Sequence, residues 1–188
     1  VAKKICEETP NSYMASQFTN PSNPSAHELT TGPEIFNQLD GNVGAVVCGV
    51  GTGGTITGLG KFFEKNSPST EMVLADPKGS IVKNAVESNE FKDADYSWLV
   101  EGIGEDFIPE TLDLNYIKKA YEISNEEAFN IIRDLALNEG ILAGSSSGTL
   151  IAAALKYCKE QEKNKNVVTF VCDNGEKYLN TAYNTIWL

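Results

Sequence analysis

Glycines and threonines of the kind that bind a phosphate follow a short apolar run near residue 50. The stretch reads Gly49-Val50-Gly51-Thr52-Gly53-Gly54-Thr55. Glycine permits a positive φ and lets the backbone approach a ligand closely, while threonine hydroxyls add hydrogen-bond donors. A helix that begins here would direct its unpaired N–H groups and its positive dipole end toward an anion. The stretch therefore predicts a phosphate site, and the alternative is a glycine turn that binds nothing.

The same glycines also fit a dinucleotide-binding motif. Gly49, Gly51 and Gly54 spell G-x-G-x-x-G, and Asp76 follows at about the ~20-residue distance where such motifs place a ribose-binding carboxylate. A Walker A loop is excluded, because Thr55-Ile56 stands where that motif requires Lys followed by Ser or Thr. A nicotinamide-dependent oxidoreductase therefore remains an alternative at this point.

Short apolar runs alternate with segments of helical pattern along the chain. The expected strands are 12–16, 45–50, 72–75 and 167–172, and the expected helices are 3–8, 32–39, 56–63, 125–136 and 150–158. We expect 21–24 to be extended, because its two prolines disfavour a helix, and 87–94 to be a polar surface segment. This alternation predicts an α/β protein with a doubly wound parallel sheet, whose ligands lie at the carboxyl ends of the strands.

Four segments together carry a family resemblance: Gln17–Pro24, Gly51–Thr55, Val100–Gly104 and Gly144–Gly148. In this order they resemble the pyridoxal-phosphate β-synthases of fold type II, the family that contains cysteine synthase and cystathionine β-synthase. The resemblance implies the Rossmann-like large domain of the tryptophan synthase β-like fold over residues 19–188. Residues 1–18 would be the end of a smaller domain and a crossing strand. Segments 76–80, 101–109 and 178–188 are more similar to cystathionine β-synthase than to cysteine synthase.

The resemblance implies pyridoxal 5′-phosphate as the cofactor and assigns its contacts. The phosphate would be bound by Gly51, Thr52, Gly53, Gly54 and Thr55, and Ser146 would hydrogen-bond the pyridine nitrogen. A neutral hydroxyl at that nitrogen leaves the ring mostly unprotonated, which suits loss of a β leaving group better than transamination. The alternative for Ser146 is a helix N-cap, which the three adjacent serines also fit.

Substrate-lining residues also follow from the resemblance, and each has a plainer alternative. They are Gln17, Glu101, Gly102, Ile103 and Gly104. Glu101 could place a carboxylate near an amino-acid substrate or lie solvated at the rim, and Gln17 could satisfy backbone at a strand end. The glycines could form an ordinary turn. Glu105 stands where many eukaryotic family members carry a tyrosine, so no role is carried over for that ring. Trp98, Trp187 and most other aromatics are expected in the core.

No lysine in the chain has the sequence context of the family's Schiff-base lysine. We therefore expect no catalytic residue here and no activity from this chain alone. The other half of the catalytic core, with the asparagine-bearing substrate loop, would either precede Val1 in a longer enzyme or exist as a separate polypeptide. The implied reaction is β-replacement, serine plus homocysteine giving cystathionine, in a homodimer acting on small amino-acid substrates. The alternatives are cysteine synthase, which uses O-acetylserine and sulfide, the dinucleotide-dependent oxidoreductase, and a catalytically inactive paralogue that acts as an interaction protein.

The composition of the chain bears on which partners it can bind and in which compartment it is found. The chain has 26 acidic and 15 basic residues among 188, a net charge of −11, which disfavours nucleic acid or an anionic membrane as partner. No apolar run approaches the ~20 residues of a membrane span, and the start lacks a signal-peptide pattern. The four cysteines lie far apart without a C-x-x-C pair, which favours reduced thiols in a cytoplasmic protein over a disulfide framework or a metal site. The single histidine, His27, makes a Ser-His-Asp triad hard to support.

Overall fold

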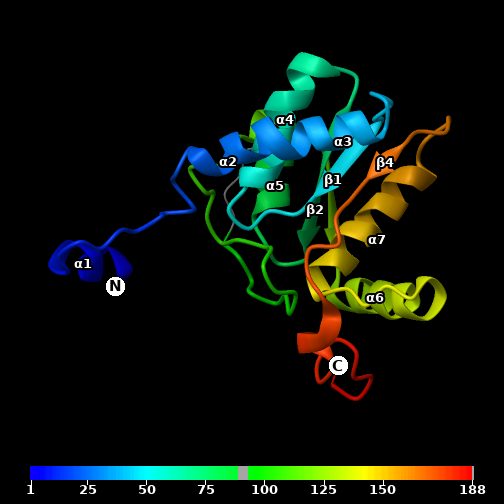
Figure 1. Ribbon diagram of the computed structural model, residues 1–188. Helices are drawn as coiled ribbons and strands as arrows, with labels where there is room; N and C mark the ends of the chain where they lie inside the picture. Colours follow the sequence, from blue (N-terminus) through cyan, green and yellow to red (C-terminus); the bar gives the residue numbers. More distant parts are fainter. Residues whose placement is uncertain (89–92, 188) are drawn as a thin grey trace.

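A four-stranded parallel sheet forms the centre of the protein. The computed structural model describes residues 1–88 and 93–187. The strands are β1 (Ala45–Cys48), β2 (Glu71–Pro77), β3 (Ile117–Ile123) and β4 (Val167–Val168), in the spatial order β3-β2-β1-β4. All neighbouring strands run parallel, so the expected α/β fold with a parallel sheet is confirmed (Figure 1).

Helices cover both faces of this sheet. Their bounds are α1 (Ala2–Glu8), α2 (Ser22–Ala26), α3 (Gly32–Gln38), α4 (Gly54–Asn66), α5 (Val82–Ser88), α6 (Asn125–Glu139) and α7 (Ser145–Lys159). A π-helical turn at His27–Thr31 joins α2 to α3, and short 3-10 turns occupy Leu114–Tyr116 and Gly175–Tyr178. Figure 1 shows α6 and α7 together on one side of the sheet and α2 to α5 on the other.

Two apolar cores follow from the alternation of side chains along the strands. Val46 of β1 and Leu74 of β2 pack in the core on the α4 side, which includes Ile56, Leu59 and Phe63. Val47 and Val73 point the opposite way, into the core that α6 and α7 cover with Phe129, Ile132 and Leu150. Burial of β1 on both faces explains why its sequence is a continuous apolar run.

Several expected elements differ in the structure. Residues 12–16, expected to form a strand, have no regular secondary structure. Segment 21–24 is not extended but enters α2, where Pro24 is the third helical residue and its missing N–H would have had no partner within the helix. The strand expected at 167–172 is only two residues long. Helices α4 and α7 begin earlier than expected, at Gly54 and Ser145, since glycine and serine form their first turns.

The expectation that both tryptophans and most other aromatics lie in the core is wrong. Trp98 is half-buried, Trp187 is 41% exposed, and most of the other described aromatics are half-buried or exposed. Tyr157, Phe63 and Phe129 are among the few that are fully buried. Of the polar segment expected at 87–94, residues 87, 88 and 93 are exposed, and 89–92 lie outside the described residues. No helix among the described residues is long and apolar enough to cross a membrane.

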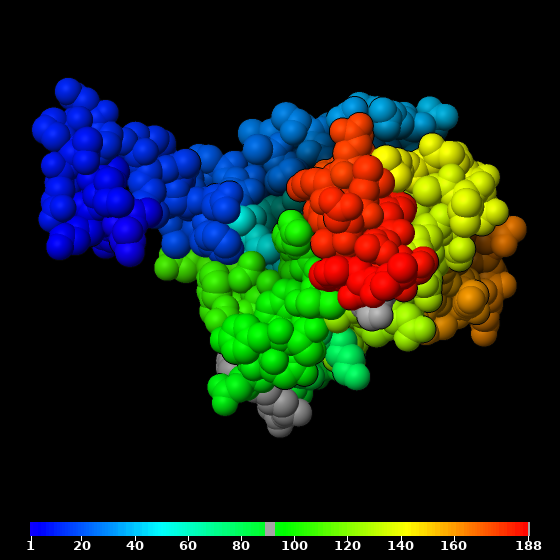
Figure 2. Space-filling view, turned by 90° about the horizontal axis from the view of Figure 1, so that it is seen from below, coloured from blue at the N-terminus to red at the C-terminus, as the bar shows by residue number. Residues whose placement is uncertain are grey.

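The N-terminal residues project from the body of the molecule. Figure 2 shows the chain's first residues, including α1, extending to one side of the compact part that holds the sheet. No residue of α1 is buried. A domain boundary between residues 18 and 19 agrees with this arrangement and stays a prediction.

Candidate functional site

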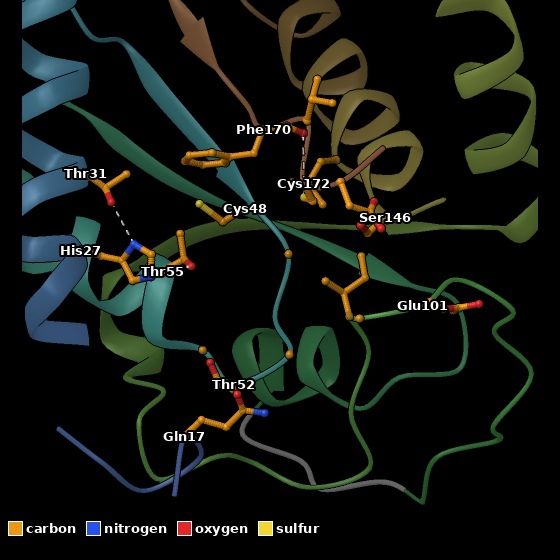
Figure 3. A pocket seen from close by; sticks show the side chains of 18 of the residues that line it. Gln17, His27, Thr31, Cys48, Thr52, Thr55, Glu101, Ser146, Phe170 and Cys172 are labelled. Carbon is orange, nitrogen blue, oxygen red and sulfur yellow. Dashed lines mark hydrogen bonds between the residues drawn. The ribbon is translucent and has the colours of Figure 1, made fainter. Parts of the chain in front are cut away.

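A cavity of about 730 Å³ lies at the carboxyl end of β1, where the parallel-sheet architecture predicts a ligand. The glycine loop (Gly49–Thr55) forms one wall, and the start of α7 with segment 170–178 forms another (Figure 3). Nine of the eleven predicted site residues line it: Gln17, Gly51, Thr52, Gly53, Thr55, Glu101, Gly102, Ile103 and Ser146. Gly104 instead lines an adjoining cavity of about 300 Å³, and Gly54 lines neither cavity.

The glycine loop forms a cradle that side chains would fill. Gly53 is the N-cap of α4 and has a φ of 81°, which L side chains rarely adopt. A Cβ at Gly51 would lie 2.5 Å from the carbonyl oxygen of Gly102, and one at Gly54 would lie 1.9 Å from Asn23 Oδ1. The N-cap residue Gly53 has no side chain to cap α4, and within its first turn only the Gly54 N–H has a recorded partner, Thr52 Oγ1, so the N–H groups that follow can bind an anion.

The Thr52 hydroxyl is oriented by donors from two sides. Asn23 Nδ2 donates to Thr52 Oγ1 over 2.9 Å, and the Gly54 N–H donates to the same oxygen over 3.4 Å. Because the oxygen accepts twice, its own proton is left to donate to a ligand. Thr111 Oγ1 donates to the Thr52 carbonyl oxygen over 2.5 Å and holds the loop from outside. Sequence analysis gave no role to Asn23 or Thr111, although Asn23 lies in one of the family segments.

A neutral histidine supports the other threonine of the loop. His27 Nδ1 lies 3.0 Å from Thr31 Oγ1, and His27 Nε2 lies 3.3 Å from Thr55 Oγ1 (Figure 3). Burial lowers the pKa of His27, so the ring is neutral near pH 7 and links two hydroxyls without adding charge. Sequence analysis considered His27 only for a triad, and nothing in its local sequence marks this position.

Of the three adjacent serines, Ser146 faces the cavity while its neighbours bind backbone. Ser145 Oγ accepts from the Glu101 N–H over 3.1 Å, and Ser147 Oγ accepts from the Cys172 N–H over 2.9 Å. The N-cap of α7 is Gly144, and no side chain caps that helix. The alternative of Ser146 as an N-cap is therefore wrong, and its hydroxyl is placed to meet a ligand.

The carboxylates around the site fall into different roles. Glu101 is exposed, and Figure 3 draws its side chain directed away from the other labelled side chains of the cavity. Asp76 is 1% exposed, and its Oδ2 accepts from the Lys83 N–H over 2.8 Å at the start of α5. Burial raises the pKa of Asp76 to about 6. Because Asp76 lies outside the cavity and holds α5, it cannot serve as the ribose-binding carboxylate of a dinucleotide site.

Among the described residues, the lysine that lines the cavity is Lys177. Its Nζ lies 2.8 Å from Asp173 Oδ2, and this hydrogen bond raises the pKa of Lys177. Its side chain is 62% exposed. A lysine that forms a Schiff base must react as a neutral amine, so Lys177 does not fit that role.

Comparison with known proteins assigns the chain to a family. A family model described as "Pyridoxal-phosphate dependent enzyme" matches residues 1–173, and the chain belongs to this family. It is 42% identical over 186 residues to cysteine synthase A of Escherichia coli strain K12, covering 96% of this chain and 57% of that protein. It is 41% identical over 189 residues to cystathionine beta-synthase of Apis mellifera, covering 100% of this chain and 37% of that protein.

A solved structure agrees with this assignment. The chain resembles the crystal structure of the O-acetylserine-dependent cystathionine beta-synthase from Helicobacter pylori with a TM-score of 0.85 and 35% identity, covering 100% of this chain and 57% of that one. The chain thus spans little more than half the length of these bacterial relatives. Its family is that of the cysteine synthase and cystathionine β-synthase-like enzymes, which depend on pyridoxal phosphate.

Proposed function

We propose that this chain supplies the cofactor-binding part of an enzyme for pyridoxal-phosphate-dependent β-replacement. The observation that carries the proposal is that the glycine cradle and the Ser146 hydroxyl face one cavity of about 730 Å³. An anion site and a neutral hydroxyl, on opposite walls, match the two polar ends of pyridoxal phosphate. A bare glycine turn would need no second polar group across the cavity.

The residues of the chain divide the work of binding. The first-turn N–H groups of α4 and the hydroxyls of Thr52 and Thr55 bind the phosphate. Ser146 hydrogen-bonds the pyridine nitrogen without protonating it, and Gln17 with Gly102 and Ile103 forms the wall beside the amino-acid substrate. When bound, pyridoxal phosphate supplies the electron sink for negative charge at the substrate Cα. The proton-accepting lysine would come from outside this chain, because Lys177 is paired with Asp173 and no lysine here has the sequence context of the family's Schiff-base lysine.

We propose serine and homocysteine as the substrates and cystathionine as the product of the complete protein. Segments 76–80, 101–109 and 178–188 favour this subtype. Cysteine synthase, with O-acetylserine and sulfide, is the second candidate, because identities of 42% to a cysteine synthase and 41% to a cystathionine β-synthase do not separate the two. The Helicobacter pylori neighbour, named as O-acetylserine dependent, supports a test of both leaving groups.

One assay tests this proposal. The complete protein, loaded with pyridoxal phosphate, is offered serine or O-acetylserine against homocysteine or sulfide under one set of conditions. We expect cystathionine as the main product. A preference for O-acetylserine with sulfide and no cystathionine would move the protein to cysteine synthase, and no β-replacement with any pair would favour the inactive paralogue. We also propose that the complete protein is cytoplasmic and forms a homodimer. Light scattering of the complete protein would test the homodimer.

A further inference from the structure

Glu105 places a carboxylate beside the glycine loop, at a position that no assigned role explains. It lines the adjoining cavity of about 300 Å³, which shares Gln17, Gly51, Thr52, Gly102 and Ile103 with the main cavity. A Cβ built at Gly51 would lie 3.9 Å from Glu105 Oε1. The carboxylate therefore lies at the border between the two cavities, next to the cradle that suits a phosphate.

The backbone of Glu105 is fixed, but its carboxylate has no partner among residues 1–88 and 93–187. Ser80 Oγ accepts from the Glu105 N–H over 3.1 Å, and the Ile81 N–H donates to the Glu105 carbonyl oxygen over 3.0 Å. Among the described residues, no hydrogen bond or ion pair involves the Glu105 carboxylate, and the one charged group that shifts its pKa is Asp106. Burial and the neighbouring charge of Asp106 raise the pKa of Glu105 to about 7. A half-buried carboxylate without a cation is costly for a fold and typical of a binding site.

The other side chains of the small cavity suit an organic cation. Phe18 and Trp98 present aromatic rings, and Gln17 presents an amide. Aromatic faces attract ammonium groups, and a carboxylate binds them by charge-assisted hydrogen bonds. A phosphate and a carboxylate at close range repel each other unless a positive charge lies between them. The position of Glu105 thus favours a ligand that carries its own ammonium group.

We propose that Glu105 and the small cavity form the subsite for the ammonium group of an amino-acid thiol, the second substrate. The inference rests on the proposed β-replacement and names the residue that selects such a thiol over sulfide. Ile103 and Gly102 form the boundary across which the thiol sulfur would reach the main cavity.

The test compares two thiols in the complete protein loaded with pyridoxal phosphate. Glu105→Gln keeps the shape of the side chain and removes its charge. The KM for homocysteine should rise about ten-fold or more, as for loss of a charge-assisted contact, while the KM for sulfide should change less than about two-fold. Glu105→Asp, which retains the charge, should recover part of the loss. Equal effects on both thiols, or none on homocysteine, would overturn the proposal.

Asp106→Asn is the matched control, because it removes the neighbouring carboxylate, which accepts from the exposed Tyr96 hydroxyl over 2.8 Å. We expect it to leave the KM for homocysteine unchanged or lower. Circular dichroism and retained visible absorption of the cofactor show that each variant is folded.

A binding measurement separates this proposal from the proposed function. Calorimetry compares homocysteine with the mercaptobutanoate that lacks only its amino group. The protein should prefer homocysteine, and Glu105→Gln should abolish that preference, even if no β-replacement is found. If the unmutated protein binds both compounds equally, the ammonium subsite does not exist, whatever the activity.

Discussion

Asn23 Nδ2 donates hydrogen bonds to Thr52 Oγ1 over 2.9 Å and to the Gln17 carbonyl oxygen over 2.8 Å. One amide thereby joins α2 to the glycine loop and to the segment that enters the site. It also leaves the Thr52 proton free for a ligand. A side chain 29 positions away in sequence therefore orients the Thr52 hydroxyl as a donor toward the predicted phosphate site.

Asn23→Ala should weaken cofactor binding without unfolding the protein. The variant loses the donor that orients Thr52, a change worth about 1 kcal/mol, or about five-fold in the dissociation constant of pyridoxal phosphate. Cofactor titration followed by visible absorption measures it. Asn66→Ala is the control, since Asn66 Nδ2 binds the Phe62 carbonyl oxygen over 2.8 Å at the far end of α4. Equal losses in both variants would remove the special role of Asn23.

Ser146→Ala and Ser147→Ala should fail in different ways. Ser146 faces the cavity, so its loss should leave the fold and cofactor binding nearly intact and slow turnover by about two- to ten-fold, the equivalent of one hydrogen bond. Ser147 is fully buried and accepts from the Cys172 N–H, so its loss should lower the free energy of unfolding. Turnover kinetics and chemical denaturation, measured on both variants, test whether Ser146 affects turnover and Ser147 affects the free energy of unfolding. Unchanged turnover in Ser146→Ala would leave Ser146 without a role at the cofactor ring.

Asp76 should make the protein less stable as the pH rises through about 6. Burial raises the pKa of this carboxyl from its ordinary ~4 to about 6, a change equivalent to about 3 kcal/mol. The folded state favours the protonated form of this carboxyl. The resulting contribution to the free energy of unfolding is complete below pH ~4 and is lost as the pH rises through about 6. Over this interval the free energy of unfolding of the unmutated protein should fall by up to that amount relative to Asp76→Asn. Parallel pH dependence in both proteins would contradict this.

The cysteines should differ in reactivity toward an alkylating reagent. Cys172 is exposed and lines the cavity, and Cys158 is exposed on α7, away from the cavity. Cys48 also borders the cavity but is buried, and burial raises its pKa far above the ordinary range. Peptide mass spectrometry should find Cys172 and Cys158 labelled and Cys48 unlabelled. Bound pyridoxal phosphate should protect Cys172 and leave Cys158 reactive. Labelling of Cys172 that the cofactor does not slow would place the cofactor elsewhere.

Local sequence patterns predicted the parts of the fold that depend on local interactions. The apolar run of β1 could be predicted because burial on both faces restricts a strand to apolar residues. The glycines at the start of α4 could be predicted because a positive φ favours glycine. The same reasoning failed at 21–24, because proline disfavours a helix interior but is tolerated in its first turn.

Contacts between distant segments could not be predicted in this way. Thr111 binds the Thr52 carbonyl oxygen across 59 positions, and Asn23 and His27 support the loop from a separate helical segment. Their residue types carry no periodicity or spacing that points to the glycine loop. Glu105 was noticed as a departure from the family pattern, but its place between two cavities became visible only in the structure.

Gly53→Asp cannot test the phosphate site alone. Gly53 has a φ of 81°, and a Cβ there would lie 2.6 Å from Leu112 Cβ, so any side chain strains the fold as well as the site. Loss of cofactor in that variant would have two causes. Substitutions at Asn23 and Ser146, which keep the backbone unstrained, separate binding from folding.

Parallel titration of the complete protein with pyridoxal phosphate and with NAD tests the central claim most directly. The glycine cradle, the N–H groups at the start of α4 and Ser146 predict that the protein takes up pyridoxal phosphate, develops the visible absorption of the bound cofactor and keeps it through dialysis, with no response to NAD. Tight binding of NAD together with no uptake of pyridoxal phosphate would contradict the account.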